Sequence, residues 1–283
     1  PRIYRPYRIR AHGCKTFFTP LASNPDQPLV QAVAVREGSI VATGSLEEIQ
    51  QTLSGETYSV DSRFDDFVLI PGLINQHEHA WLASLLFITE ILSIEDWVLP
   101  DRTIERAKDA ANYRERLTKI VAEHTDPSEV IYTWGFHQLF HGKLTRSDLD
   151  EISDTIPIVV LQRSIHEQIH NTRALEYFGI NQTLIDNAPA SVRAQTNLEE
   201  GHFWEQGQSL IVPAVFADLF HPSRYIPALE QVEAYWHSAG STLVAEPGGS
   251  ASAAFIETQN QVLSDSDTPF RMHYIVDGRS FVA

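Results

Sequence analysis

Two histidines separated by one residue, His77 and His79, are the side chains whose type and spacing best suit chemistry in this chain of 283 residues. They follow a Pro71-Gly72 turn and an apolar run, which predicts a strand from Leu73 to His79. Residues i and i+2 of a strand face the same side, so both imidazoles could bind one metal ion. The spacing therefore predicts metal ligation by His77 and His79.

Chance weakens this prediction, and the context strengthens it. Twelve histidines in 283 residues give about 0.5 His-x-His pairs from composition alone. Two exposed or hydrogen-bonded histidines are therefore the competing interpretation. The apolar strand that leads into the pair favours the metal. The pairs His137 with His141 and His166 with His170 are spaced four apart, but chance predicts about as many such pairs, so a second metal site is not favoured.

The elements that must position these histidines change in character near residue 70. Before it, Val30 to Val35 and Ser39 to Thr43 predict a hairpin, and Ser45 with Glu48 forms a capping-box pattern. After it, strands alternate with helices, which indicates a parallel sheet. The segment from about 181 to 209 is expected to be a loop. The predicted strands are Phe67–Ile70, Val130–Gly135, Ile156–Gln162, Thr242–Ala245 and Phe270–Val276, and the predicted helices are Thr103–Glu123, Ala174–Gly179 and Pro227–Ala239.

Composition excludes several classes of partner. Lys plus Arg total 21 and Asp plus Glu total 37, a net charge of −16 that repels nucleic acid and anionic lipid. The single cysteine, Cys14, cannot form an internal disulfide. No apolar stretch is long enough for a membrane span, and the first residues have no signal-peptide core. We expect a cytoplasmic protein, although a leader removed before Pro1 would leave no trace.

Several sequence blocks resemble the amidohydrolase superfamily and its YtcJ-like branch, amidohydrolase family 3. The first block is Leu69-Ile70-Pro71-Gly72-Leu73-Ile74-Asn75-Gln76-His77-Glu78-His79. Further blocks follow in order: Trp134-Gly135-Phe136-His137, Leu144–Asp150, Pro157–Val160, Ser164-Ile165-His166, Asn171 and Gly240-Ser241-Thr242. The chain departs from the common pattern at Asn75, where most members have Asp, and at Glu246-Pro247, where Asp-Ala is common.

The resemblance implies an α/β fold, a (β/α)8 TIM barrel that is partial in this chain, with a small β-sandwich domain. Residues 1–69 would form the N-terminal part of the sandwich. Residues 70–283 would form the first part of the barrel, with an inserted excursion at about 80–230. The resemblance also implies one or two divalent metal ions, usually zinc. The other ligands and the general base would lie beyond Ala283, so the remainder of a parent chain or another subunit is expected to complete the barrel.

The function implied by the resemblance is hydrolysis of an amide-type C–N bond, other than a peptide bond, in a small molecule by a metal-activated water. Two alternatives stay open: a catalytically inactive regulatory or binding protein, and deamination or phosphoester hydrolysis by the same water. His166, Trp134 and Glu246 are the candidates for substrate contact. Each has a structural alternative: a carboxylate at a strand end, such as Glu246, is often solvated or paired, His166 could have a structural role, and Trp134 could be a core aromatic. Gly248-Gly249, after Glu246, could approach a ligand closely.

Overall fold

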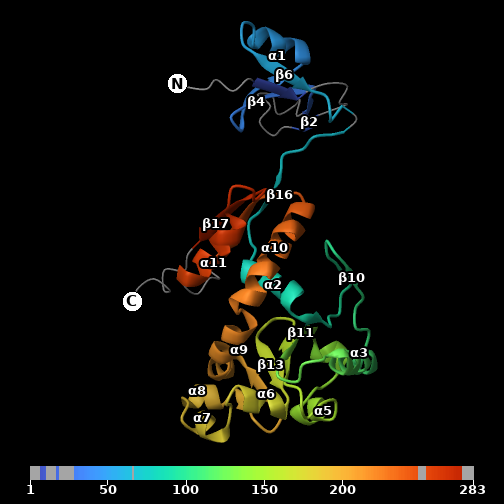
Figure 1. The fold of residues 1–283 in the computed structure, drawn as a ribbon, viewed down its shortest axis with the longest axis vertical. Coiled ribbons are helices and arrows are strands. Elements are labelled where there is room, and N and C mark those ends of the chain that lie inside the picture. The colour runs from blue at the N-terminus through green and yellow to red at the C-terminus, as the bar shows by residue number, and fades with distance from the viewer. Residues whose placement is uncertain (1–6, 11–16, 19–28, 66, 248–252, 276–283) are drawn as a thin grey trace. The chain divides into compact units, whose positions relative to one another are not determined.

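The protein is described here by a computed structural model of residues 7–10, 17–18, 29–65, 67–247 and 253–275 (Figure 1). It divides into two compact units, Pro1–Leu73 and Ile74–Ala283. Cys14, Gly248-Gly249 and the last residue of the predicted strand Phe270–Val276 lie outside the described residues. No helix among those described is both long and apolar enough to cross a membrane.

The first unit contains a four-stranded sheet with the order β5-β4-β1-β6 and a separate pair of short strands, β2 and β3. Strand β1 is antiparallel to β4 and parallel to β6. Helix α1 covers Ala32 and Ala34 with Ile49 and Leu53. The elements are β1 (Tyr7–Arg10), β2 (Phe17–Phe18), β3 (Leu29–Val30), β4 (Ala32–Arg36), β5 (Ser39–Gly44), α1 (Leu46–Thr52) and β6 (Tyr58–Asp61).

Two local predictions for this unit are confirmed. Strands β4 and β5 form the expected antiparallel hairpin, and Glu37 and Gly38 at its turn both have positive φ, 51° and 78°, as tight hairpin turns require. The capping box between Ser45 and Glu48 starts α1. The strand predicted over residues 67–70 is wrong, because only Leu69 there takes part in a β-bridge.

A six-stranded sheet with the order β14-β15-β13-β12-β11-β8 forms the larger part of the second unit. Strands β8, β11 and β12 are parallel, whereas β13, β15 and β14 continue the sheet antiparallel. All residues of β11 are buried, as in a sheet covered on both faces. The strands are β8 (Glu90–Ile91), β11 (Ile131–Phe136), β12 (Ile158–Gln162), β13 (Glu167–His170), β14 (Thr196–Asn197) and β15 (His202–Trp204), and β9 (Trp97–Val98) pairs with β10 (Thr103–Ile104) outside this sheet.

A second sheet of the same unit has three strands in the order β17-β16-β7. These are β7 (Leu73–Asn75), β16 (Ser241–Pro247) and β17 (Arg271–Ile275), and β16 runs parallel to β17. Helix α10 packs against α2, α11 and β16, as Figure 1 shows for the orange helix beside the teal one. This packing brings the end of β16 next to the start of α2.

The helices of the second unit surround these two sheets. They are α2 (Ala80–Ile88), α3 (Ala110–Glu123), α4 (Gln138–His141), α5 (Arg146–Asp150), α6 (Thr172–Tyr177), α7 (Gln182–Asp186), α8 (Ala190–Arg193), the 3₁₀ helix η1 (Glu205–Leu210), α9 (Val212–Leu219), α10 (Pro222–Ser238) and α11 (Ala253–Leu263). The main core joins buried side chains of α2, β11, β12, α9 and α10.

Three sequence predictions for this unit need correction. The helix expected from Thr103 begins at Ala110, because the Asp109 side chain caps it by accepting from the Asn112 N–H. The helix expected from Pro227 begins at Pro222 and contains Pro227. Residues 181–209 contain α7, α8, β14, β15 and part of η1 and are not a loop. The chain is thus a mixed α/β protein with parallel strand pairs, and the TIM barrel and the β-sandwich stay predictions.

Candidate functional site

His77 and His79 lie between β7 and α2, so the prediction that both sit on one strand is wrong. Strand β7 ends at Asn75, whose side-chain Oδ1 accepts from the backbone N–H of His77 at 3.3 Å. This local hydrogen bond competes with continuation of the strand. The backbone N–H of Glu78 donates to the carbonyl oxygen of Ala245 in β16 at 3.0 Å. His79 is the N-cap of α2.

The two imidazole rings are nevertheless adjacent. The ring centroids of His77 and His79 are 5.2 Å apart and the ring planes are at 84°. Within the described part of the chain, no hydrogen bond forms to the ring of His77, which is exposed. The loop therefore keeps together the pair that the sequence predicted as metal ligands.

Glu246, near the end of β16, contacts this pair from a distant part of the chain. Its carboxylate is 1% exposed. Oε1 lies 2.6 Å from Nδ1 of His79, and Oε2 accepts from the backbone N–H of Ala80 at 2.7 Å. The sequence predicted Glu246 as a substrate contact, and the structure places its two oxygens on His79 and on the first residue of α2.

Burial raises the pKa of Glu246 above its ordinary value, while the hydrogen bonds from His79 and from the Ala80 N–H act in the opposite direction. The nearby carboxylate of Glu78 also raises this pKa. The Glu78 side chain itself accepts from Nδ2 of Asn75 at 3.1 Å. The two carboxylates therefore have different partners, one on His79 and the other on Asn75.

Sequence reasoning missed two tyrosines near Glu246, and it missed Gln259, which contacts one of them. Tyr274 is paired with Glu246 in the register of β17 and β16, and its buried hydroxyl has no hydrogen-bond partner among the residues that the structure describes. Tyr225 in α10 accepts a hydrogen bond from Nε2 of Gln259 in α11 at 2.9 Å. Burial raises the pKa of both tyrosines. Nothing in the local sequence pattern indicates these residues, because each comes from a different element.

The donor atoms at His77 and His79 fit a zinc-type ion in part. Because Nδ1 of His79 contacts the Glu246 carboxylate, Nε2 is the nitrogen that remains for a metal ion. Carboxylate–histidine–metal arrangements are common in metal sites. Imidazole nitrogen is a preferred zinc ligand. Among the described residues no group of three or more His, Cys, Asp or Glu is arranged to hold a metal ion. The two histidines thus supply half of a tetrahedral shell.

Trp134 and His166 lie elsewhere in the second unit. Trp134 is buried in β11, 5.5 Å from Trp97 between ring centroids. His166 is exposed and its Nδ1 is 3.1 Å from a carboxylate oxygen of Glu205. Neither residue shares a hydrogen bond, ion pair or ring contact with His77, His79 or Glu246 in the chain as described. Their role in substrate contact stays a prediction.

The backbone around His166 is strained. Ile165 has φ of 65° and Glu205 has φ of 45°, a region that β-branched and other non-glycine residues rarely occupy. The Glu205 backbone N–H donates to the carbonyl oxygen of His166 at 2.9 Å. Strain of this kind is concentrated at functional sites, which keeps His166 a candidate.

The remaining paired histidines have structural partners. His141 is buried and stacks on Tyr113 with ring centroids 4.7 Å apart. His170 is fully buried, and its Nε2 lies 3.2 Å from Oε1 of Gln168. Burial lowers the pKa of His170 to about 3, so this ring is neutral near pH 7.

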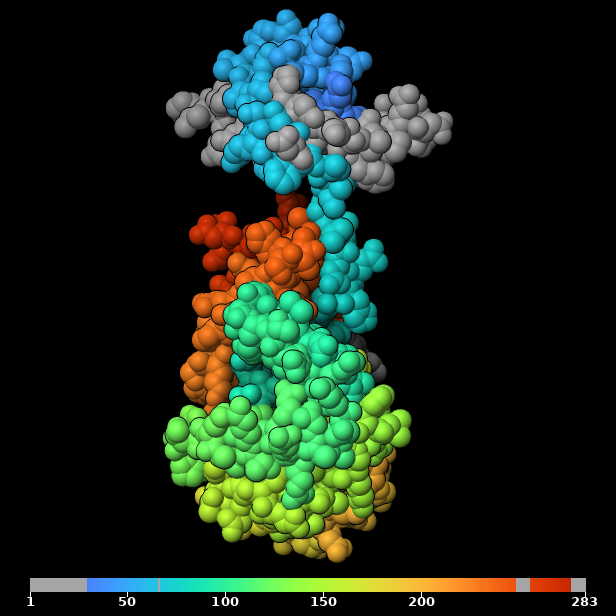
Figure 2. Space-filling model, turned by 90° about the vertical axis from the view of Figure 1, so that its right-hand side faces the viewer, coloured from blue at the N-terminus to red at the C-terminus, as the bar shows by residue number. Residues whose placement is uncertain are grey.

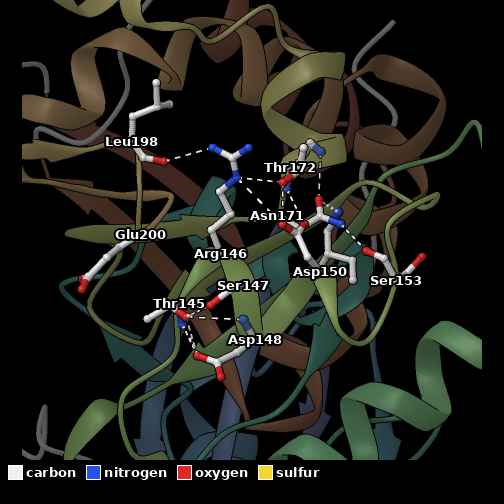
Figure 3. Close-up of polar contacts among 12 residues, drawn as sticks. Thr145, Arg146, Ser147, Asp148, Asp150, Ser153, Asn171, Thr172, Leu198 and Glu200 are labelled. Atoms are coloured by element: carbon white, nitrogen blue, oxygen red, sulfur yellow. Dashed lines mark hydrogen bonds and ion pairs between the residues drawn. The ribbon is translucent and has the colours of Figure 1, made fainter.

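The block Leu144–Asp150 forms a polar network, drawn in Figure 3. Thr145 and Asp148 make a capping box at the start of α5. Asp150 accepts from the backbone N–H of Thr172 at 2.8 Å and from its hydroxyl at 2.5 Å. Arg146 donates from Nε to that hydroxyl oxygen at 2.7 Å. The network joins α5 to the start of α6, and both carboxylate oxygens of Asp150 accept hydrogen bonds within it.

Asn171, the N-cap of α6, also makes hydrogen bonds through both polar atoms of its side chain (Figure 3). Its Oδ1 accepts from the backbone N–H groups of Ile158 and Ala174 at 2.9 and 2.8 Å. Its Nδ2 donates to the carbonyl oxygens of Ser153 and Ile156, both at 2.9 Å. Four hydrogen bonds on a buried amide indicate a structural role.

A cavity of about 830 Å³ lies between α3, β11 and the segment from the end of α2 to β10. Figure 2 shows the surface hollowed between teal and green residues on this side of the second unit. Its lining is mixed, with Phe87 and Ile120 beside Arg116, Lys119 and other residues. His77, His79 and Glu246 do not line it, so this cavity is separate from the histidine pair.

Comparisons with known proteins show a shared fold. No model of a protein family matches the chain. It is similar to the exoenzymes regulatory protein AepA of Pectobacterium carotovorum subsp. carotovorum, with 22% identity over 231 residues, 80% of this chain and 47% of that protein. Solved structures of uncharacterized metal-dependent hydrolases from Pyrococcus horikoshii OT3 and Pyrococcus furiosus cover 95% of this chain with TM-scores of 0.63 and 0.61 and identities of 14% and 13%.

The chain spans about half the length of these three proteins, namely 47%, 48% and 50%. At such low identity the two structures establish the fold alone. The finer resemblance to amidohydrolases of the YtcJ-like branch stays a prediction.

Proposed function

We propose that this chain forms part of a metal-dependent hydrolase that cleaves an amide-type C–N bond in a small molecule. The observation that carries the proposal is the adjacent pair His77 and His79, with the buried Glu246 carboxylate 2.6 Å from Nδ1 of His79. A buried carboxylate on the rear nitrogen of a histidine orients the ring toward a metal ion. The two Pyrococcus proteins that share the fold are named metal-dependent hydrolases, which supports the same class.

His77 and His79 would hold a divalent ion, with zinc favoured by their imidazole donors. Such an ion lowers the pKa of a bound water toward 7 and polarises a substrate carbonyl. The chain's own residues then have separate tasks. Asn75 holds the backbone of His77, and Glu246 holds the ring of His79. The other ligands and the general base would come from residues outside this chain, and His166 and Trp134 are proposed to contact the substrate.

The test combines metal content with turnover. The chain is expressed with and without a C-terminal extension from its parent protein, and bound metal and hydrolysis of a panel of small amides are measured. We expect zinc in the extended protein, with loss of both zinc and turnover in the double variant His77→Ala/His79→Ala. His237→Ala, at an exposed position in the last turn of α10, is the matched control and retains both. An extended protein with no metal and no turnover would refute the proposal.

A regulatory or binding protein without catalysis is the second candidate, and the name of AepA, a regulatory protein, favours it. The same experiment separates the two functions. Metal binding without hydrolysis of any amide, ester or phosphoester would favour the regulatory protein. Hydrolysis of a phosphoester or release of ammonia in place of amide cleavage would retain the enzyme class and change the bond.

A further inference from the structure

The carboxylate of Glu246 meets two groups with different hydrogen-bonding ability. The backbone N–H of Ala80 can only donate, so Oε2 of Glu246 must accept this bond of 2.7 Å. The other oxygen, Oε1, lies 2.6 Å from Nδ1 of His79, and such a contact requires one proton between the two atoms. The position of that proton decides which nitrogen of His79 has a free lone pair.

Each oxygen of the Glu246 carboxylate faces a nitrogen atom at hydrogen-bond distance, an arrangement that suits an ionised carboxylate and a proton on Nδ1. Oε2 of Glu246, which belongs to β16, contacts the first residue of α2, a nine-residue helix whose N-terminal end attracts negative charge. An ionised carboxylate only accepts hydrogen bonds, so Nδ1 must donate. In a neutral imidazole the second nitrogen, Nε2, then has the lone pair. Because Glu246 is 1% exposed, water does not compete for this contact.

We propose that Glu246 is a positioning residue that holds His79 as the Nδ1–H tautomer and thereby reserves Nε2 for a bound metal ion. The role of Nε2 in metal binding rests on the proposed function. The Nδ1–H tautomer of His79 concerns only residues of this chain. Glu246 thus acts through His79 and has no direct contact with the substrate.

The substitution Glu246→Gln makes the proposal testable, because an amide has one accepting and one donating end. The Ala80 N–H requires the amide oxygen, since two donors would otherwise face each other. The amide NH₂ then points at Nδ1 of His79, which must accept. We therefore expect the substitution to move the proton of His79 from Nδ1 to Nε2, the nitrogen that would bind the metal.

The tautomer is read by two-bond ¹⁵N–¹H correlation spectra of the metal-free, histidine-labelled extended protein near pH 8, with the His79 signals assigned through His79→Gln. We expect Nδ1–H in the wild-type chain and Nε2–H in Glu246→Gln. Glu78→Gln is the matched control, because Glu78 is the neighbouring carboxylate but hydrogen-bonds to Asn75; its spectrum should show Nδ1–H. A wild-type His79 with the proton on Nε2 overturns the proposal, and this result does not depend on whether Glu246→Gln folds.

Zinc affinity of the extended protein, measured by competition with a chromophoric chelator, tests the part of the proposal that concerns the metal. Loss of such a carboxylate partner costs about 10–100-fold in metal affinity, so we expect a decrease of that size for Glu246→Gln and none for Glu78→Gln. Equal zinc affinity in Glu246→Gln and wild type overturns the positioning role. A wild-type Nδ1–H tautomer without zinc binding refutes the proposed function and leaves the tautomer assignment valid. Zinc binding with an Nε2–H tautomer overturns the tautomer assignment and leaves the proposed function valid.

Discussion

At the scale of single residues, burial sets the protonation state of His170. His170 is fully buried, and burial lowers its pKa from 6.5 to about 3. His79 and His166 instead lie beside the carboxylates of Glu246 and Glu205. Residues of one type thus have three different electrostatic environments, none of which follows from the spacing of histidines along the chain.

The lowered pKa of His170 predicts that the native state loses stability in mild acid. Because its folded pKa lies below its unfolded value, the unfolded chain binds the proton first, and the native state loses stability as pH falls below about 6.5. The slope from this one group is about 1.4 kcal/mol per pH unit. Urea unfolding of the extended protein, in which the other chemical denaturation measurements below are also made, should show a smaller slope between pH 7 and 5 for His170→Gln than for wild type. His237→Gln, at an exposed position, is the control, and equal slopes in all three proteins would contradict the prediction.

The backbone of Gly135 in β11 lies too close to Ser93 to accept a side chain. Its φ is 106°, and an added Cβ would lie 2.5 Å from Cβ and 2.7 Å from Cα of Ser93. We expect Gly135→Ala to lower the free energy of unfolding by more than about 2 kcal/mol. Gly179→Ala shares the positive φ but meets no atom within 4 Å, so it should cost only about 1 kcal/mol. Equal losses in urea titrations of the two variants would show that the contact with Ser93 is unimportant.

At the scale of elements, side-chain caps connect helices to strands. Asn171 caps α6 and also binds the N–H of Ile158 at the start of β12, whereas Asn181 caps the exposed helix α7 through one bond to the Leu184 N–H. The N-cap asparagine of α6 therefore links a helix to a strand, whereas the N-cap asparagine of α7 bonds only within its own helix.

The two caps form a matched pair for mutation. Asn171→Ala leaves several buried backbone groups without a partner and should cost about 2–4 kcal/mol. Asn181→Ala removes one exposed cap and should cost about 1 kcal/mol. Chemical denaturation of both variants checks the difference. Equal costs would mean that the link between α6 and β12 contributes little to stability.

At the scale of the whole molecule, the three-stranded sheet has two unprotected edges among the described strands. β7 and β17 flank β16, and both edge strands expose isoleucine, with Ile74 61% and Ile275 58% exposed. Unpaired, apolar strand edges favour association with further strands. We therefore expect a further polypeptide piece, from a parent chain or another subunit, to pair with this sheet.

The expression of residues 1–283 alone tests this expectation. Light scattering should show self-association or aggregation, and thermal unfolding should lack a single cooperative transition. Ile275→Lys, which puts a charge on the β17 edge, should reduce association, and Val98→Lys, an exposed apolar residue outside this sheet, should leave it unchanged. A monomer with one cooperative transition would contradict the partial-barrel prediction.

Features that depend on neighbouring residues could be predicted from the sequence. The capping box joins Ser45 to Glu48 over three residues, and the β4–β5 hairpin turns at Glu37 and Gly38. His77 and His79 lie close together because one residue separates them, although they follow β7 and are not part of it. Such contacts form whatever the rest of the chain does, since both partners are local.

The environment of His79 depended on tertiary structure. Glu246 is 167 residues from His79 along the chain, and only the packing of β16 beside β7, with α10 against α2, brings its carboxylate to the imidazole. The sequence predicted that Glu246 follows a strand ending at Ala245, whereas β16 extends to Pro247 and includes Glu246, and the sequence pattern could not name its partner. A hydrogen bond between distant residues requires a specific backbone path over the whole interval, and that path is selected by burial of the shared core and not by the spacing of any motif.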